Sequence, residues 1–374
     1  IQEHLSGFMQ NFLFQGCKDT IPETFKTKKV SRVNNYLTKR PPPIFSYFCE
    51  NMPMEAFIPY QKAIVTYLEA YSSEKEPRNL YAPIEYILNL GGKRLRPSLV
   101  LAAAELYGVH HEKALPAAAA IEVFHNFTLV HDDIMDEAAL RRGEPTIHQK
   151  WDLNTGILSG DAMLIEAYRY FENYPPSLAL SLLKLFNKTA LEVCEGQQYD
   201  VDFETRTDVS ESEYLQMIQY KTAVLLGCAL QMGALIGDAS EKESNHLYQF
   251  GLLLGTAFQI QDDYLDAFGS PENFGKTVGG DIIENKKTLL YIKAFELANE
   301  EQKNVLELAY QDQTEQKVER VKELFVATGA EASVKQAVQA YTELSLKELE
   351  KLSIADNKKE LLTQFAHSLM IRNL

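Results

Sequence analysis

Hydrophobic residues recur at helical spacing along the chain from Met54 to its end. In segments such as EAFIPYQKAIVTYLEAY, apolar side chains fall three and four positions apart, as on one face of an amphipathic helix. Glycine and proline separate such segments, for example at Gly91, Gly92 and Pro97. No segment alternates apolar and polar residues as a β-strand does. The pattern therefore predicts an all-α fold, a single large bundle of roughly a dozen helices around a central cavity.

The longest helices can be placed from their apolar runs and from the residues that separate them. The run over 115–135 is first alanine-rich and then apolar, which predicts a long buried helix. Later helices are expected near 154–173, 176–203, 210–236, 240–268, 288–311, 315–327, 330–351 and 357–372.

Residues 1–53 differ in character from the rest of the chain. They carry seven lysines and arginines against four acidic residues, and the triple proline at 41–43 interrupts regular structure. A transit peptide is an alternative, although such peptides contain fewer acidic residues and more serine and arginine. We expect a non-core, weakly structured extension over 1–53 and one all-α domain over 54–374.

Composition narrows the possible partners and the location. Hydrophobic residues make up 45% of the chain, enough for a large core. The net charge of −15 argues against nucleic-acid binding, so an anionic ligand would need a local basic cluster or a bound metal. The four cysteines form no CxxC pair and indicate reduced thiols in a cytoplasmic protein. No apolar run reaches the ~18 residues of an integral membrane segment.

A cluster of charged residues follows the alanine-rich helix. Asp132, Asp133 and Asp136 are followed by Arg141 and Arg142. The i,i+4 spacing puts Asp132 and Asp136 on one helical face, where close carboxylates repel each other and favour a bound cation. Hard oxygen ligands suit Mg²⁺, which also takes phosphate oxygens, and the arginines could hold phosphate groups. The alternative is a solvated helix end with acids followed by bases.

The same acidic spacing occurs a second time, at the end of another long apolar segment. Asp262, Asp263 and Asp266 repeat the i, i+1, i+4 pattern. Two such motifs could face each other across a bundle and hold magnesium ions in its core. Directly downstream, GSPENFGKT resembles a phosphate-binding P-loop, but its glycine spacing fails and a helix precedes it. Lys276 in this segment could still bind phosphate as a point charge.

Six sequence motifs follow one another along the chain. They are GGKRLRP, HDDIMDEAALRRGEPTIH, GQQYD, YKTA, FQIQDDYLDAFG and FGKTVGGDIIENKKT. Together they resemble the trans-prenyltransferases, or polyprenyl diphosphate synthases, from Met54 to the C-terminus. The resemblance implies an all-α homodimer that joins isopentenyl diphosphate head-to-tail to an allylic diphosphate. It also implies three Mg²⁺ ions in the closed, substrate-bound state.

The resemblance assigns roles to individual residues. It implies that metal ligands are Asp132, Asp133, Asp136, Asp200, Asp262, Asp263 and Asp266. The allylic diphosphate would contact Arg141, Lys221, Lys276 and Lys286. A metal-free pocket would hold isopentenyl diphosphate through Lys93, Arg96, His125 and Arg142. Lys221 is expected to act in catalysis, with Thr222 and Gln259 beside the reacting carbons.

Several of these residues have ordinary structural alternatives. His125 on an apolar helix could be a core histidine that its neighbours satisfy, and Asp200 could cap or pair on a helix. Lys221 could extend from a buried position to solvent. Arg94 is ambiguous, because it lies on a different helical face from its basic neighbours.

Bulk near the first acidic motif should limit the length of the product. Helix rise places Phe127 about 7.5 Å and Phe124 about 12 Å before Asp132, along the path of a growing chain. In the family that the chain resembles, an aromatic residue five positions before the motif accompanies short products. Thr128 stands where farnesyl-type animal enzymes usually carry a second aromatic residue. We therefore expect twenty-carbon geranylgeranyl diphosphate, with fifteen-carbon farnesyl diphosphate as the second choice.

Two other classes of protein share part of this pattern. A class I terpene cyclase also ionises a diphosphate with aspartates and magnesium, but it has no use for a second diphosphate pocket. A non-catalytic subunit of a heteromeric prenyl synthase tends to lose acidic motifs, and both motifs are complete here. The sequence therefore favours an active prenyltransferase.

Overall fold

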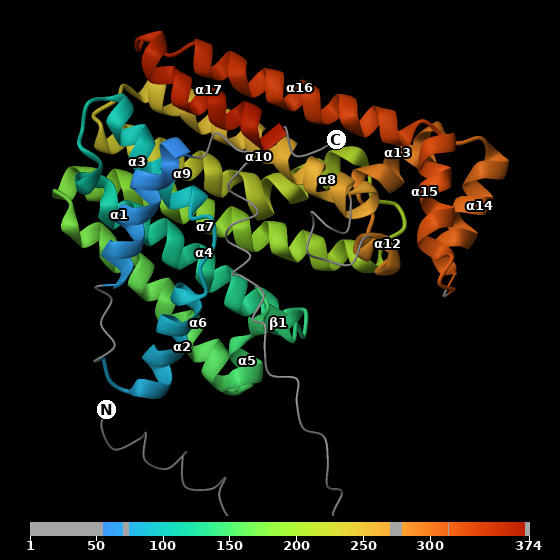
Figure 1. Ribbon diagram of the computed structural model, residues 1–374, viewed down its shortest axis with the longest axis horizontal. Helices are drawn as coiled ribbons and strands as arrows, with labels where there is room; N and C mark the ends of the chain where they lie inside the picture. Colours follow the sequence, from blue (N-terminus) through green and yellow to red (C-terminus); the bar gives the residue numbers. More distant parts are fainter. Residues whose placement is uncertain (1–54, 70–74, 270–278, 313, 371–374) are drawn as a thin grey trace, which may run out of the picture. The chain divides into compact units, whose positions relative to one another are not determined.

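Helical periodicity is realised along nearly all of the chain that the computed structural model describes, which is residues 55–69, 75–269, 279–312 and 314–370 (Figure 1). All of these residues belong to one compact unit. The predicted all-α class is confirmed. The extension predicted over 1–53 lies outside the described residues and stays a prediction.

The α-helices of the described residues follow one another along the chain with short connections. They are α1 (Ile58–Glu69), α2 (Arg78–Asn89), α3 (Leu95–Leu106), α4 (Leu115–Met135), α5 (Ile147–Lys150), α6 (Leu153–Arg169), α7 (Pro176–Thr205), α8 (Glu211–Ile218), α9 (Val224–Ile236), α10 (Glu241–Phe268), α12 (Gly280–Ile283), α13 (Leu289–Leu297), α14 (Glu300–Gln311), α15 (Lys317–Ala327), α16 (Ala330–Glu350) and α17 (Asp356–Met370).

Local sequence explains where helix boundaries match the prediction and where they differ. α4 has the predicted bounds, because its apolar run is uninterrupted over 115–135. The single helix predicted over 288–311 is instead two helices, α13 and α14. Asn299 and Gln302 form a capping box that starts α14, so the backbone leaves the helical path just before Asn299.

The loop after α4 contains a short two-stranded ribbon that the hydrophobic pattern did not predict. β1 (Leu140–Arg141) pairs antiparallel with β2 (Glu144–Pro145). Arg142 and Gly143 form the turn with positive φ angles of 55° and 81°, the conformation that two-residue hairpins prefer. Strands of two residues are too short to give an alternating pattern, so periodicity could not reveal them.

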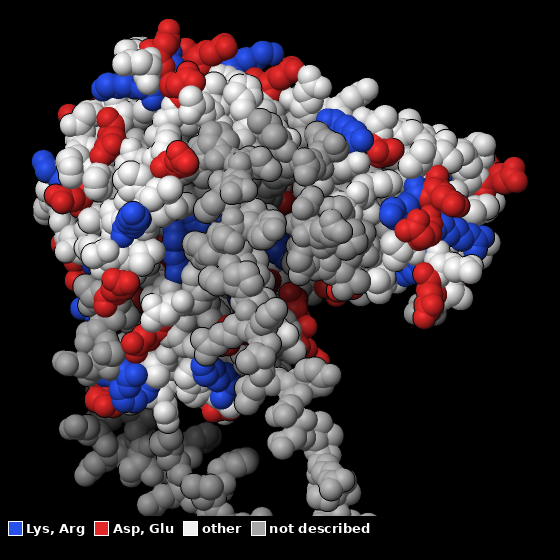
Figure 2. All heavy atoms as spheres, in the orientation of Figure 1, with Lys and Arg blue, Asp and Glu red and all other residues white. Residues whose placement is uncertain are grey.

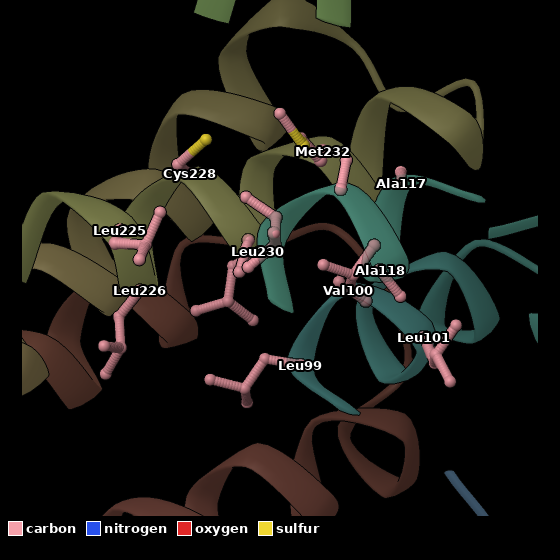
Figure 3. Close-up of a cluster of buried hydrophobic side chains, with 14 of the residues drawn as sticks. Leu99, Val100, Leu101, Ala117, Ala118, Leu225, Leu226, Cys228, Leu230 and Met232 are labelled. Atoms are coloured by element: carbon pink, nitrogen blue, oxygen red, sulfur yellow. The ribbon is translucent and has the colours of Figure 1, made fainter. Parts of the chain in front are cut away.

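The centre of the larger core is formed by α3, α4 and α9, which are apolar around most of their circumference. Figure 3 shows side chains from the three helices together, among them Leu99, Ala118 and Leu230, all fully buried. A Cβ atom at Gly233 of α9 would lie 2.3 Å from the carbonyl oxygen of Val100 of α3. Glycine therefore permits a backbone approach between α9 and α3 that any larger residue would prevent.

The long helix α10 connects the larger core to a second one. Leu247 and Phe250 in its first half pack in the larger core, whereas Ile260 and Tyr264 in its second half pack in the other. α16 runs along α10 (Figure 1). Because both halves of α10 are buried, the acidic motif at its end is held at a fixed position.

Charged side chains of both signs are interspersed over the face drawn in Figure 2. Within the described ranges, no helix combines the length and the apolar character needed to cross a membrane. Cys194 and Cys228 are free thiols.

A buried ion pair fixes the start of α3 against α4. The guanidinium of Arg94 donates hydrogen bonds to the Glu122 carboxylate and to the Leu88 carbonyl. The two charged side chains are only 5% and 4% exposed. Glu122 also accepts a hydrogen bond from the Asn126 amide at 3.0 Å. These contacts give Arg94, which was ambiguous in the sequence, a structural position.

We expect Glu122→Gln to lower the free energy of unfolding by about 3–5 kcal/mol, because it leaves the buried Arg94 charge without a counter-charge. Urea unfolding measures the change. Glu300→Gln is the control, because Glu300 is 90% exposed in its pair with Lys303 and its loss should change stability by less than about 0.5 kcal/mol. Equal effects of the two substitutions would contradict the prediction.

Candidate active site

The first acidic motif occupies the last turn of α4 and the residue after it. Asp133 is buried and accepts hydrogen bonds from Nε of Arg141 at 2.8 Å to both of its oxygens. Nη2 of Arg141 lies 3.8 Å from Asp132. Partial desolvation and then the charge of Asp132 raise the pKa of Asp136. Asp133 thus anchors the arginine, and the outer carboxylates of Asp132 and Asp136 repel each other.

A π-helical turn, Gln219–Ala223, lies between α8 and α9 and carries Lys221. Its Nζ donates a hydrogen bond to Asp200 of α7 and lies 3.9 Å from Asp132 of α4. A Cβ atom at Gly196 of α7 would lie 2.2 Å from the Lys221 backbone nitrogen, so glycine permits this approach. Burial lowers the pKa of Lys221, but the charges of Asp200 and Asp132 outweigh burial and raise it. Lys221 is therefore a cation that faces carboxylates.

The second acidic motif lies in the last two turns of α10 and is tied to its neighbours by hydrogen bonds. Asp263 accepts a hydrogen bond from the Tyr214 hydroxyl at 2.6 Å and from the Gln259 amide at 2.9 Å. The Thr222 hydroxyl donates to the amide oxygen of Gln259 at 3.2 Å. Burial and then the charge of Asp281 raise the pKa of Asp263. Thr222 and Gln259 are thus linked by hydrogen bonds that end on the Asp263 carboxylate.

Tyr214 and Asp281 belong to this site although the sequence analysis did not single them out. The backbone N–H of Asp281 donates to Asp266 at 2.9 Å, and its carboxylate lies 3.5 Å from Nζ of Lys286. Burial and then the charge of Asp266 raise the pKa of Asp281. Asp281 lies within the motif FGKTVGGDIIENKKT, so the sequence offered a signal for it. Tyr214 is one of 19 tyrosines and carries no comparable signal.

Electrostatic interactions join the two acidic motifs into one site. Lys286 pairs with Asp281 beside the second motif, and its charge also acts on Asp136 of the first. The negative charge of Asp262, in the second motif, likewise acts on the guanidinium of Arg96. The predicted ligand Asp200 interacts with Lys286 as well as with Lys221. Lys276 lies outside the described residues.

The donor set of this site fits a hard divalent cation. Within the described part of the site, the candidate ligand atoms are carboxylate oxygens from α4, α7 and α10. Burial first, and then the charge of a neighbouring carboxylate, raise the pKa values of Asp136 and Asp263, and a bound cation would offset both effects. Oxygen ligands in excess of local positive charge are the environment that Mg²⁺ or Ca²⁺ prefers.

A second, basic group lies where α3 begins. Nη1 of Arg96 lies 3.2 Å from Nε2 of His125, and Nη1 of Arg142 donates to the Gly91 carbonyl. Lys93 is exposed on the same segment. Nε of Arg96 is buried and has no hydrogen-bond partner among the residues that the structure describes. A buried guanidinium nitrogen without a partner is unfavourable, and an anion would satisfy it.

Aromatic side chains of α4 and α7 pack together before the first acidic motif. Phe124 and Phe127 are buried, and their ring centroids lie 5.6 Å apart. Phe186 of α7, which sequence reasoning did not identify, packs on Phe124 at 5.1 Å. Thr128 is partly buried, and its hydroxyl donates to a carbonyl of its own helix. The two phenylalanines therefore form one face of a larger aromatic cluster.

Known proteins are similar to this chain in sequence and fold. The sequence profile of the polyprenyl synthetase family matches residues 77–328. A geranylgeranyl pyrophosphate synthase of Geoglobus acetivorans is 41% identical over 287 residues, which cover 76% of this chain and 88% of that protein. A crystal structure of a geranylgeranyl pyrophosphate synthase superposes with a TM-score of 0.78 at 54% identity, covering 85% of this chain and 97% of the other.

One further solved structure contains ligands. It is a polyprenyl synthase from Caulobacter crescentus CB15 complexed with calcium and isoprenyl diphosphate. It superposes with a TM-score of 0.74 at 29% identity and covers 86% of this chain and 96% of its own.

His125 should make folding stability fall in acid. Burial and then the charges of Arg96 and Arg142 hold its pKa well below the usual range, so the folded chain keeps it neutral. The unfolded chain binds an extra proton below about pH 6.5, so stability is lost as the pH falls through that value. The free energy of unfolding should therefore fall by up to ~1.4 kcal/mol for each pH unit below that value because of His125. His125→Gln should abolish this part of the acid dependence.

Urea unfolding of both proteins at neutral pH and near pH 5 measures the effect. His367→Gln, at an exposed position of α17, is the matched control and should follow the wild-type profile. If His125→Gln also follows it, His125 does not contribute to the acid dependence.

Proposed function

We infer that this chain, which belongs to the polyprenyl synthetase family and is a short-chain prenyl diphosphate synthase, joins isopentenyl diphosphate to an allylic diphosphate at the site between α4, α7 and α10. The observation that carries this proposal is the presence of two different anion sites. One is rich in carboxylates and fits a metal-bound diphosphate. The other contains Arg96, His125 and Arg142 and needs no metal.

The acidic residues would hold the metal ions. We propose Mg²⁺, three ions in the substrate-bound state, with ligands from Asp132, Asp133, Asp136, Asp200, Asp262, Asp263 and Asp266. Bound Mg²⁺ neutralises the leaving diphosphate and so favours ionisation of the allylic carbon–oxygen bond. Hydrogen bonds from Tyr214 and Gln259 hold Asp263 in place.

Three cationic side chains are placed to bind the allylic diphosphate. Arg141, Lys221 and Lys286 now pair with carboxylates of the site. With diphosphate and metal bound, these carboxylates would hold the metal and the cations would bind phosphate oxygens. Lys276, outside the described residues, is proposed for the same role. The charges of Asp200 and Asp132 keep Lys221 protonated for it.

The basic group at the start of α3 is proposed to bind isopentenyl diphosphate. Its members are Lys93, Arg96, His125 and Arg142, which offer nitrogen donors. The buried Nε of Arg96 can donate a hydrogen bond to a diphosphate oxygen. Thr222 and Gln259 would lie beside the reacting carbons. The proton lost after carbon–carbon bond formation would go to the released diphosphate, because the nearby carboxylates are occupied as ligands.

The proposed product is geranylgeranyl diphosphate, with farnesyl diphosphate second. The cluster of Phe124, Phe127 and Phe186 supports a short product, because its bulk lies on α4 and α7 where a growing chain would extend. The names of the relatives at 41% and 54% identity support the twenty-carbon choice.

Labelled isopentenyl diphosphate with each allylic primer in turn, followed by chromatography of the products, tests the function. We expect a twenty-carbon diphosphate. Asp132→Asn should lower turnover roughly a hundredfold or more, because charge stabilisation at the leaving group is lost. Asp356→Asn, which changes a 98% exposed carboxylate on α17, should leave turnover unchanged. Hydrocarbon released from the allylic primer alone would indicate a terpene cyclase, and no product from the wild-type chain a non-catalytic subunit.

Phe127→Ala should lengthen the product, because it removes a ring from the aromatic cluster. Thr128→Phe adds bulk one position later and should shorten it. Both product distributions are compared with wild type by chromatography under the same primer and metal conditions. Unchanged chain lengths in both variants would show that this part of α4 does not limit the product.

A homodimer is proposed from an apolar stripe along α6. Leu153, Ile157, Leu158 and Ile165 are exposed by 52%, 39%, 59% and 61%, and helical spacing groups them on one side of α6, with the exposed Asp161 among them. Exposed apolar side chains in such a row indicate a protein interface. A second copy of the chain is the proposed partner, because most oligomers of soluble proteins are symmetric pairs of identical chains.

Ile165→Lys should weaken this dimer, because it places a charge in an apolar contact. Sedimentation velocity at micromolar concentration should show a shift from dimer to monomer. Leu308→Lys on α14, where the wild-type leucine is 62% exposed, is the matched control and should remain dimeric. A wild-type monomer, or an unaffected Ile165→Lys dimer, would refute the α6 interface.

A further inference from the structure

Three metal-ligating side chains meet at the end of α3 that lies away from the candidate active site. Glu105 lies in the last turn of α3, and His110 and His111 lead into the short 3-10 helix His111–Ala114. Their ligand atoms all lie within 4.8 Å of one another. Helix rise separates Glu105 from Arg96 by about 13.5 Å along α3. We propose that Glu105, His110 and His111 bind a divalent transition-metal ion such as Zn²⁺.

Two of the proposed ligands are already held in place. The Glu105 carboxylate accepts hydrogen bonds from the Tyr60 hydroxyl at 2.7 Å and shares one with Nδ1 of His111 at 2.6 Å. The Tyr60 ring also packs edge-on against the His111 ring, at 5.8 Å. Burial acts to raise the pKa of Glu105, but these hydrogen bonds outweigh it and the net pKa is lowered. The hydrogen bond from Tyr60 is of the kind that orients ligating carboxylates in metal sites, and the proton shared between Glu105 and Nδ1 of His111 would be released to solvent when the ion binds.

The third ligand, His110, has the freedom to complete the site. Its side chain is 63% exposed, and its ring stacks on His111 with the centroids 4.4 Å apart. A tetrahedral ion separates its ligand atoms by on the order of 3.3 Å, so His110 needs only a modest side-chain rotation. Glu112, whose carboxylate lies 3.6 Å from Nδ1 of His110, could supply the fourth ligand in place of water.

The ligand types distinguish this site from the acidic motifs. Two imidazoles and one carboxylate suit Zn²⁺, Co²⁺ or Ni²⁺, whereas Mg²⁺ prefers oxygen ligands throughout. The ordinary alternative is a hydrogen-bonded pair of Glu105 and His111, which does not involve His110. A bound ion would connect α3 to the following 3-10 helix and, through Tyr60, to α1. It would therefore stabilise this end of the bundle.

Calorimetric titration of the chelator-treated full chain with Zn²⁺ tests the proposal. Excess Mg²⁺ is present throughout to occupy the acidic motifs. We expect one Zn²⁺ per chain and an affinity at least tenfold weaker in His110→Ala and in His111→Ala. His110→Ala is the decisive variant, because its exposed side chain contributes little to folding, which circular dichroism checks. His367→Ala, at an exposed position of α17, is the matched control and should bind as wild type.

Thermal unfolding gives a second measurement. Zn²⁺ should raise the melting temperature of the wild-type chain and of Asp132→Asn, but not that of His110→Ala, because an ion that binds only the folded state stabilises it. No binding by the wild-type chain, equal binding by His110→Ala, or loss of binding in Asp132→Asn would each overturn the proposal. Activity is not used as the measurement, so failure here leaves the prenyltransferase assignment untouched.

Discussion

Repulsion among carboxylates at the ends of α4 and α10 is the constraint on which the site depends. The negative ends of the helix dipoles add to the charge of both acidic motifs. Cations are therefore recruited from separate elements: Arg141 from the ribbon, Lys221 from the π-helical turn and Lys286 from the segment after α12. Burial and then the charges of Asp132 and Asp281 keep the pKa values of Asp136 and Asp263 raised. A bound cation would therefore be favoured at these carboxylates.

Close helix packing keeps these charges at fixed positions. Gly233 allows α9 to approach α3, and Gly196 allows α7 to approach the turn that carries Lys221. Both halves of α10 are buried in hydrophobic cores. A rigid apolar frame of this kind can hold like charges near one another, because separation would require the cores to open.

α3 has a different chemical environment at each end. Its start carries Arg96 and is fixed by the buried pair of Arg94 and Glu122. Its end carries Glu105, which is hydrogen-bonded to Tyr60. Anion binding at one end and the proposed transition-metal site at the other can therefore act independently, because the two groups share one rigid helix but no side-chain contact that the structure describes.

The sequence by itself determined the all-α class, the bounds of α4 and the location of both acidic motifs, because periodicity, caps and motif spacing are local properties. It did not resolve the short ribbon or the break before α14, since two-residue strands and a single cap leave little pattern. Only the tertiary structure brought Tyr214 and Asp281 to the second motif and Phe186 to the aromatic cluster. Such contacts depend on how helices distant in sequence pack together, which no local pattern encodes.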